Sequence, residues 1–442
     1  MRIYLTDNNP GQPDVQSYSR KDVEVLFPIA GKTVEQLCRE NEHLLIFPYS
    51  LDEADDRIGD LSVIGIQNTD DPERVVITTG NMMGFIGIGS LQLKIQSRFD
   101  DGRDDYLLHY MLQKVLSFNV FDLDYSKEQE EVFDLAMFMF PSFLANALRQ
   151  GVYKEYRSYK RNGTRITGVL EFGRHLANNV PFNGNIAYTA REYSYDNDMT
   201  QLIRHTIEFM KTKQYGLSVL NRNYGTIENV KTIVEYTPSY QRNERLHVVN
   251  KNLRQKVHPY YSGYQPLRSL CLQILRMEEI RYGESDDEIS GILFDGAWLW
   301  EEYVNTLLCH QGFLHPENRK KTGRICLFTD GSGFRYPDFY KDNIVLDAKY
   351  KRLGDYRDVA KIGRDDIHQM ISYIVCLQAN MGGFVAPLKY KQPFIPKKKI
   401  KGTSATLSIF GIEISKNASS YASFCKEMEK LEADFLHSLV QG

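Results

Sequence analysis

The sequence predicts an α+β protein of several domains, with a β-rich N-terminal module, a helical middle region and a C-terminal α/β domain. The chain of 442 residues is longer than one hydrophobic core usually supports. Its first hundred residues are rich in β-branched residues and turn glycines, whereas apolar residues recur at helical spacing in the middle. Helical and strand patterns then alternate towards the C-terminus. We therefore predict domains at 1–150, 151–285 and 286–442.

The predicted N-terminal module contains strands followed by helices. Val75–Phe99 combines short alternating apolar runs with turn glycines, which is typical of β-strands. From about Asp104 an apolar stripe at helical spacing predicts a helix, and a second helical pattern covers Glu130–Leu148. Pro141 should kink or break that second helix, because proline cannot donate the backbone hydrogen bond.

The predicted middle region begins with tyrosines alternating with basic residues, namely Lys154, Arg157, Lys160, Arg161 and Arg165. Such interleaving is suited to nucleic acid, since lysine and arginine contact phosphates and aromatic rings stack on bases. An amphipathic surface element remains the alternative, because charged runs are usually solvated. Helical patterns follow, and the polar stretch Arg281–Glu288 marks the boundary of the last domain.

Charge and hydropathy exclude some classes of protein. The net charge of −3 argues against a uniformly basic surface, so binding to a phosphate backbone would need local clusters of lysine and arginine. No stretch is apolar for long enough to span a bilayer, so we expect a cytoplasmic protein without membrane contact. Cys309, His310 and His315 form the only tight Cys/His grouping, which we expect to lie at a helix end rather than around a metal.

Two predicted strands near residue 340 carry the chemistry. Gly333–Tyr340 and Asn343–Lys351 read as a hairpin with a turn at Lys341-Asp342. Alternation along the second strand places Asp347 and Lys349 on one face. Asp338, on the first strand, is the nearest acidic companion. Charges in a half-buried strand are costly unless they are paired or coordinated, so these side chains should converge.

Two converging carboxylates, Asp338 and Asp347, are suited to bind Mg²⁺, or Mn²⁺ in its place, through hard oxygen ligands. The metal would polarise a phosphate and help to generate hydroxide from water. Lys349 would orient that water or stabilise the developing charge. The residues therefore predict metal-dependent hydrolysis of phosphodiesters.

In this context the sequence resembles the PD-(D/E)xK nuclease superfamily. Pro337-Asp338, followed by Asp347-Ala348-Lys349, matches the signature of that superfamily. The resemblance implies a metal-associated glutamate on the preceding helix, for which Glu301 lies on a more apolar helix face than its neighbour Glu302. It also implies catalytic roles for Gln369 and Tyr373, which form a QxxxY pattern. A salt-bridged hairpin without chemistry is the alternative interpretation.

From about Leu91 onward the chain is similar to the McrC family, on the segments Arg165–Asn179 and Ala187–Thr206 and on LWEEYV together with the nuclease motifs. The resemblance implies a nuclease subunit of a restriction and antiviral defence system that cuts double-stranded DNA. It further implies an AAA+ NTPase partner of the McrB type, which hydrolyses GTP and against which the region before the nuclease domain docks. The sequence itself has no phosphate-binding loop, which fits a nucleotide-binding partner.

Part of the McrC-like match is expected to be structural: we assign Arg191, Glu192 and Asp196 to the scaffold rather than to a partner contact. Two other functions remain open, a non-cutting adaptor with a degenerate nuclease fold and a stand-alone repair nuclease. The intact set of Asp338, Asp347 and Lys349 argues against the adaptor, because a scaffold gains nothing from three costly polar groups in one cleft.

Overall fold

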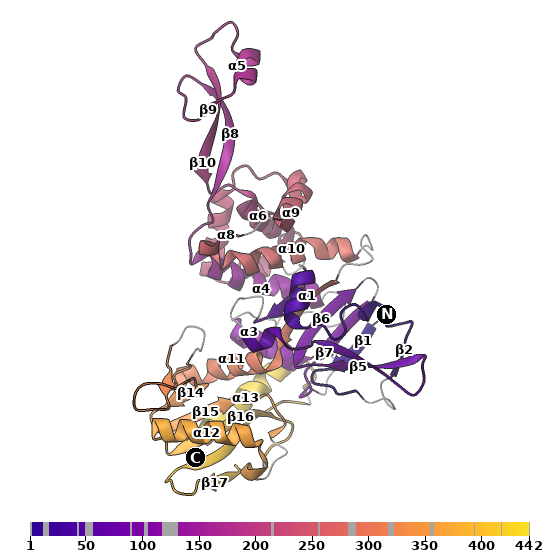
Figure 1. Cartoon of the computed structure of the whole chain (residues 1–442), viewed down its shortest axis with the longest axis vertical. Helices are drawn as coiled ribbons and strands as arrows, with labels where there is room; N and C mark the ends of the chain where they lie inside the picture. The colour runs from indigo at the N-terminus through magenta and orange to yellow at the C-terminus, as the bar shows by residue number, and fades with distance from the viewer. Residues whose placement is uncertain are drawn as a thin grey trace. The chain divides into compact units, whose positions relative to one another are not determined.

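The computed structural model divides the chain into two compact units, both visible in Figure 1. The first unit combines Met1–Val132 with Tyr282–Gly442, and the second is Phe133–Arg281. No helix in the described part of the chain is long and apolar enough to cross a membrane. The structure describes residues 2–11, 17–41, 44–48, 56–88, 91–100, 105–116, 131–213, 216–254, 257–281, 289–316, 322–353, 358–392, 394–416 and 418–441.

Strands from distant parts of the sequence form the larger N-terminal sheet. Its order is β1 (Arg2–Thr6), β7 (Leu91–Gln96), β6 (Met82–Ile88), β11 (Ile289–Asp295) and β3 (Leu44–Phe47). β11 runs antiparallel to β6 and parallel to β3. Gly84 allows this pairing, because it has a φ of +130° and a Cβ there would lie 2.1 Å from the Ile292 carbonyl oxygen.

A smaller sheet and two short helices complete the N-terminal module. The sheet has the order β2 (Ser17–Ser19), β5 (Arg74–Thr79) and β4 (Ile64–Asn68), and the helices are α1 (Val34–Glu40) and α2 (Asp56–Gly59). Apolar residues of both sheets share one core that includes Ile46, Val75 and Ile95. Three strands, β5, β6 and β7, thus cover the predicted strand-rich segment Val75–Phe99.

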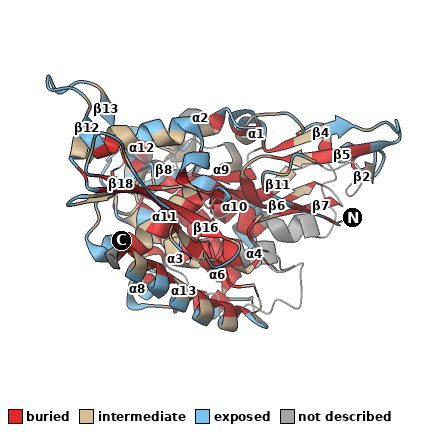
Figure 2. Ribbon diagram, turned by 90° about the horizontal axis from the view of Figure 1, so that it is seen from below, coloured by how far each residue is buried: buried red, intermediate tan, exposed pale blue. Residues whose placement is uncertain are grey.

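The C-terminal part of the first unit contains a second five-stranded sheet, in the order β14 (Phe339–Lys341), β15 (Ile344–Ala348), β16 (Met381–Leu388), β18 (Thr406–Glu413) and β17 (Lys397–Lys399). β15, β16 and β18 are parallel, whereas β14 and β17 are antiparallel to their neighbours. Every residue of β16 is buried, as the red strand in Figure 2 shows. The surrounding helices are α3 (Tyr106–Val115), α11 (Gly296–Leu308), α12 (Arg364–Leu377) and α13 (Tyr421–Gln441).

The second strand of the predicted hairpin is confirmed as β15, but the first predicted strand is not continuous. The segment predicted as one strand, Gly333–Tyr340, is split, because β13 (Phe334–Arg335) pairs with β12 (Ile325–Cys326) and only Phe339 onward pairs with β15. Asp338 therefore immediately precedes β14 instead of lying within a strand. The turn comprises Asp342 and Asn343 rather than Lys341 and Asp342, since Asp342 adopts the left-handed conformation that turns require.

The second unit is a helical body from which an arm extends (Figure 1). The arm, residues Glu155–Ser194, consists of β8 (Glu155–Gly163), β9 (Val169–Leu170), α5 (Phe172–Asn178) and β10 (Ile186–Ser194), with β8 and β10 paired along their whole length. The body comprises α4 (Glu131–Leu148), α6 (Asp198–Met210), α7 (Gly216–Leu220), α8 (Tyr224–Tyr236), α9 (Arg245–Arg254) and α10 (Tyr264–Arg281).

Pro141 does not break α4, which continues through it to Leu148. The expectation of a break was wrong, and burial explains why. Residues Met139, Phe140 and Leu144 around the proline are completely buried, so packing outweighs the loss of one backbone hydrogen bond.

The compact units differ from the division at residues 150 and 285 predicted from the sequence. Within the polar stretch that suggested the second boundary, residues 282–288 lie outside the described residues. Directly after it, β11 joins the N-terminal sheet between β6 and β3. The chain thus returns to its N-terminal module before it forms the C-terminal sheet, which makes the first unit discontinuous in sequence.

Candidate active site

Asp338 and Asp347 meet at the end of β15. Asp347 is almost completely buried, with 2% exposure. Asp338 directly precedes Phe339, which pairs with Leu346, the residue before Asp347, and the charge of Asp347 acts on the Asp338 carboxyl. Asp338 Oδ2 also accepts a hydrogen bond of 2.7 Å from the backbone nitrogen of Ala348. The strand pairing and this bond together hold the two carboxylates side by side, as the sequence predicts.

Lys349 lies between two carboxylates. Its Nζ is 2.6 Å from Asp347 Oδ2 and 3.6 Å from Asp366 Oδ1. Asp366 also contacts Lys351, with 2.7 Å between Oδ2 and Nζ. Burial by itself lowers the pKa of Lys349, but the surrounding carboxylates, Asp347 first, outweigh burial and raise it. Lys349 is therefore a positively charged group throughout the physiological pH range.

Glu301 on α11 belongs to the same group of charges. Burial, and then the negative charges of Glu302 and Asp347, raise the pKa of its carboxyl. Because 35% of the Glu301 side chain is exposed, water screens part of this repulsion. For Asp338, burial and the charges of Asp347 and Glu301 raise the pKa well above its ordinary value. Burial also raises the pKa of Asp347, although Lys349 acts against it.

The chemistry of this group fits a hard divalent cation. Asp347 Oδ1 is buried and has no hydrogen-bond partner within the described residues. An unpaired, buried carboxylate oxygen next to further carboxylates is expensive without a positive charge to neutralise it. In the described ranges no group of three His, Cys, Asp or Glu side chains is placed to hold a metal ion. Mg²⁺ is commonly bound through one or two carboxylates, with water and substrate as its other ligands.

Gln369 and Tyr373 lie together on α12 and anchor the segment that leads to Asp338. Gln369 Nε2 donates a hydrogen bond of 2.7 Å to the Tyr373 hydroxyl, which donates to the Tyr336 carbonyl oxygen at 3.3 Å. Tyr373 is buried, with 2% exposure. In the structure these two residues support the backbone two positions before Asp338, so we describe them as positioning residues.

Two residues near the carboxylates were not identified from the sequence. His315 Nδ1 donates to the Asp338 carbonyl oxygen at 2.8 Å, and His315 Nε2 lies 3.7 Å from Glu302 Oε1. Its position beyond the end of α11 gave no signal of this contact. Asp366 occupies the first turn of α12, where an acidic residue is commonplace because it complements the helix dipole. The sequence marked His315 only as a member of the Cys309, His310 and His315 grouping, and it did not distinguish Asp366 from its neighbour Asp365.

The N-terminal module contacts the backbone directly after Lys349. Arg98 donates a hydrogen bond to the carbonyl oxygen of Tyr350, and its guanidinium lies 4.6 Å from the centre of the Tyr350 ring. Asp7 holds this arginine through an ion pair of 2.7 Å. The Tyr350 hydroxyl lies 2.7 Å from Ser97 Oγ. The N-terminal module is therefore part of the support of the candidate site.

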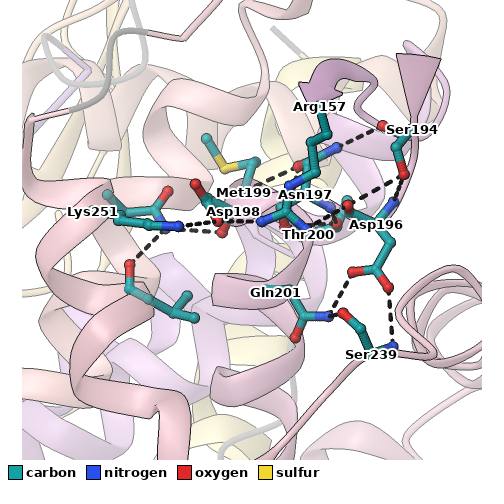
Figure 3. Close-up of polar contacts among 12 residues, drawn as sticks. Arg157, Ser194, Asp196, Asn197, Asp198, Met199, Thr200, Gln201, Ser239 and Lys251 are labelled. Atoms are coloured by element: carbon teal, nitrogen blue, oxygen red, sulfur yellow. Dashed lines mark hydrogen bonds and ion pairs between the residues drawn. The ribbon is translucent and has the colours of Figure 1, made fainter. Parts of the chain in front are cut away.

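The basic residues predicted to contact nucleic acid lie at the base of the arm and along β8, far from the candidate site in sequence. Figure 3 shows that Arg157 points into a polar network, where Nη2 lies 2.6 Å from Asp198 Oδ1 and Nη1 donates to the Asp196 carbonyl oxygen at 2.9 Å. Lys154 Nζ lies 4.2 Å from the centre of the Tyr195 ring. These two side chains are therefore engaged within the protein.

The remaining basic residues of the arm are more accessible. Lys160, Arg161 and Arg165 are exposed, and Arg161 Nη2 lies 2.7 Å from Glu192 Oε2. Among the tyrosines between them, Tyr153 is buried, with 3% exposure, so it is not available to stack on a base. Contact with nucleic acid stays a prediction for all five basic residues, Lys154, Arg157, Lys160, Arg161 and Arg165.

Asp196 and Asn197 join the arm to the helical body (Figure 3). Asp196 accepts hydrogen bonds from Gln201 Nε2 at 2.6 Å and from the Ser239 backbone nitrogen at 3.0 Å. Asn197 is completely buried and caps α6, accepting from the backbone nitrogens of Met199 and Thr200. The hydrogen bonds described here all lie within the second unit. The structure is thus consistent with a scaffold role for Asp196.

A match to a family model assigns the chain to a family. A family model described as McrBC 5-methylcytosine restriction system component matches residues 77–387. A solved half-complex from a tetradecameric assembly of Thermococcus gammatolerans McrB AAA+ hexamers with bound McrC shares 14% identity at a TM-score of 0.48, covering 98% of this chain and 100% of that chain. The cryo-EM structure of the Thermococcus gammatolerans McrBC complex shares 14% identity at a TM-score of 0.29, covering 70% and 87%. No curated protein matches.

Proposed function

Because this chain belongs to the McrC family of McrBC restriction system components, we propose that it is the DNA endonuclease subunit of an NTP-dependent restriction complex. The observation that carries this proposal is the convergence of Asp338, Asp347 and Lys349 at the end of β15, with one buried oxygen of Asp347 lacking a partner. Double-stranded DNA is the proposed substrate, and hydrolysis of a phosphodiester bond is the reaction.

Each residue of the site has a role that follows from its surroundings. Asp338 and Asp347 would hold Mg²⁺, which when bound polarises the phosphate and lowers the pKa of a coordinated water. Lys349, kept positively charged by Asp347 and Asp366, stabilises the negative charge that develops on the phosphate and orients the attacking water. Glu301, whose pKa is raised by burial and then by its acidic neighbours, is suited to accept and hold a proton.

The proposed complex divides nucleotide hydrolysis and DNA cleavage between two proteins. In the solved relative, McrC is bound to McrB AAA+ hexamers. We propose an AAA+ NTPase of the same type as the partner of this chain. The second unit, with its exposed arm, is the proposed docking region, because its Asp196–Asn197 network fixes the arm to the helical body and so gives a partner a rigid element to bind.

The test is plasmid cleavage by the full chain together with the AAA+ protein, NTP and Mg²⁺. Asp347→Ala should abolish cleavage while it leaves stimulation of NTP hydrolysis intact. Asp365→Ala is the matched control, because its side chain is 95% exposed next to Asp366. Full cleavage by soluble Asp347→Ala would refute the nuclease assignment. If the unaltered chain stimulates NTP hydrolysis but never cuts, the function is that of an adaptor.

A further inference from the structure

We propose that residues 389–401, here called the lysine segment, bind the phosphate backbone of duplex DNA beside the cleavage site. This inference rests on the proposed function. The segment has six lysines among thirteen residues, and no Asp or Glu occurs between Asp366 and Glu413. In a chain whose net charge is −3, this is a local concentration of positive charge. Such a local cluster is what a protein without overall positive charge needs to hold a polyanion.

Five of the six lysines of the lysine segment are exposed, and Lys389 is half-buried. Lys391 and Lys401 are exposed, and so are all three residues of β17, Lys397–Lys399. Lys398 Nζ is 2.9 Å from Asp358 Oδ1, so one of the lysines has an acidic partner. The aromatic rings within the segment are also exposed, Tyr390 by 68% and Phe394 by 55%, and Lys416 Nζ lies 3.7 Å from the centre of the Tyr390 ring. The segment thus offers charge to a partner, with the Phe394 ring as additional apolar surface.

Strand register relates the lysine segment to the candidate site. Lys397 pairs with Ser408, Ser408 with Gly383, and Gly383 with Leu346, the residue before Asp347. β17 lies three strands from β15, which at about 4.8 Å per strand is about 14 Å. The proximal end of the segment is equally close. The backbone nitrogen of Lys349 donates to the Val385 carbonyl oxygen at 2.9 Å. Lys389 follows Val385 by four residues, which is about 13 Å at 3.3 Å per residue.

These distances match the spacing of charge on DNA. Duplex DNA carries about one negative charge per 1.7 Å of axis, and one helical turn is about 34 Å long. A duplex with its scissile phosphate at Asp347 and Lys349 therefore has several further phosphates within about 14 Å of the cleavage site. The acidic site itself repels phosphates until a cation binds. Positive charge beside the site offsets this repulsion and keeps the duplex in place.

Lysines on an outer strand also have a purely structural use, because they discourage pairing between sheet edges. The two roles predict different behaviour. A lysine that only protects an edge leaves DNA affinity unchanged when replaced, whereas one that contacts a phosphate contributes to the salt dependence of binding. Lys391 and Lys401 lie outside β17, so they have no role in protecting its edge.

The experiment measures binding of a fluorescent duplex of about 30 base pairs, or three helical turns, to the full chain in EDTA, over a series of salt concentrations. The test variant is Lys391→Gln/Lys399→Gln/Lys401→Gln. The control, Lys21→Gln/Lys426→Gln/Lys430→Gln, removes the same charge from exposed lysines elsewhere. We expect affinity to fall roughly tenfold or more in the test variant alone, with the slope of log K against log salt shallower by about 2 to 3.

Equal slopes in the test variant, the control and the unaltered chain would overturn the inference, as would equal losses in both variants. If the triple variant aggregates, Lys391→Gln/Lys401→Gln leaves β17 intact and should make the slope shallower by about 1.8. Because binding is measured without metal, the result does not depend on cleavage. If the chain cuts DNA but its DNA binding does not depend on the lysine segment, the proposed function stands and this inference is wrong. If the chain never cuts DNA but its DNA binding depends on the segment, this inference stands and the proposed function is wrong.

Discussion

At the scale of single residues, the candidate site contains acidic side chains in positions where burial disfavours their charged form. Burial raises the pKa of three carboxyls, those of Glu301, Asp338 and Asp347, and neighbouring negative charges raise it further. A carboxyl with a raised pKa in the folded state binds its proton more tightly than in the unfolded chain. Folding is therefore favoured below the ordinary carboxyl pKa of about 4, and this stability is lost as pH rises through the folded values.

The first prediction is that the metal-free protein melts at lower temperature as pH rises from 5 to 8, and that Mg²⁺ or Mn²⁺ reverses part of this loss. The cation neutralises the repulsion that burial amplifies, and a ligand that binds only the folded state stabilises it. Differential scanning fluorimetry at each pH measures both effects. Asp347→Asn should weaken the pH dependence and abolish the response to metal, and an unchanged metal response in that variant contradicts the assignment of Asp347 as a ligand.

The second prediction separates Lys349 from the carboxylates. Lys349→Ala should lower the rate of cleavage by roughly 10²- to 10³-fold, because it removes charge stabilisation in the transition state. It should keep measurable Mn²⁺ binding, since a protonated amine is not a metal ligand. Isothermal titration of Lys349→Ala and Asp347→Ala with Mn²⁺ compares the two roles. An equal loss of Mn²⁺ affinity in both variants is incompatible with them.

At the scale of secondary-structure elements, α6 depends on an unusually well-connected cap. The Asn197 side chain accepts from two backbone nitrogens and donates to the carbonyl oxygens of Tyr153, Ser194 and Tyr195 at 3.0 to 3.2 Å. Tyr153 lies just before β8, and Ser194 ends β10. One buried side chain thus joins the start of a helix to both long strands of the arm.

The third prediction compares this cap with an exposed one. Asn197→Ala should lower the free energy of unfolding of the second unit by about 2 to 4 kcal/mol, because it removes a cap and leaves buried carbonyl groups unpaired. Asn223, which caps α8 and is exposed, is the matched control, and Asn223→Ala should cost about 1 kcal/mol. Chemical denaturation followed by circular dichroism measures both. Equal costs would show that the extra contacts of Asn197 contribute nothing.

Local patterns in the sequence predicted individual helices and strands better than they predicted which of these elements pack against each other. Asp347 and Lys349 were found because strand alternation and the short hairpin turn are encoded by neighbouring residues. β11 could not be assigned to the N-terminal sheet, since an apolar strand carries no mark of the strand it will pair with. Asp366 and His315 were missed for the same reason, because each reaches the site from another element through tertiary packing.

At the scale of the whole molecule, we ask which parts of the chain are able to fold without the rest. The domain boundary that the sequence predicts near residue 285 implies that residues 286–442 fold alone. The structure argues against this, because β11 pairs with β6 and β3 and Tyr350 is held by Arg98. The second unit, by contrast, is a continuous segment of the chain.

The fourth prediction follows from this difference. A fragment from Phe133 to Arg281 should be soluble, helical and cooperatively unfolding, because a continuous segment of this size is able to bury its own core. A fragment of residues 286–442 should lack a cooperative transition, since β11 loses both of its partner strands. Thermal melts followed by circular dichroism test both fragments. A sharp transition in the C-terminal fragment would show that the N-terminal sheet is dispensable to it.

The contact between Arg98 and Tyr350 has a consequence for making hybrids of this protein with its relatives. A graft that exchanges only residues 286–442 separates Tyr350 from Arg98, and β11 from the two strands with which it pairs. Crossovers at the limits of the second unit, after Val132 and before Tyr282, cut neither this contact nor the pairing of β11. Chimeras with those two crossovers would exchange the arm together with its helical body and would keep the candidate site and its N-terminal support unchanged.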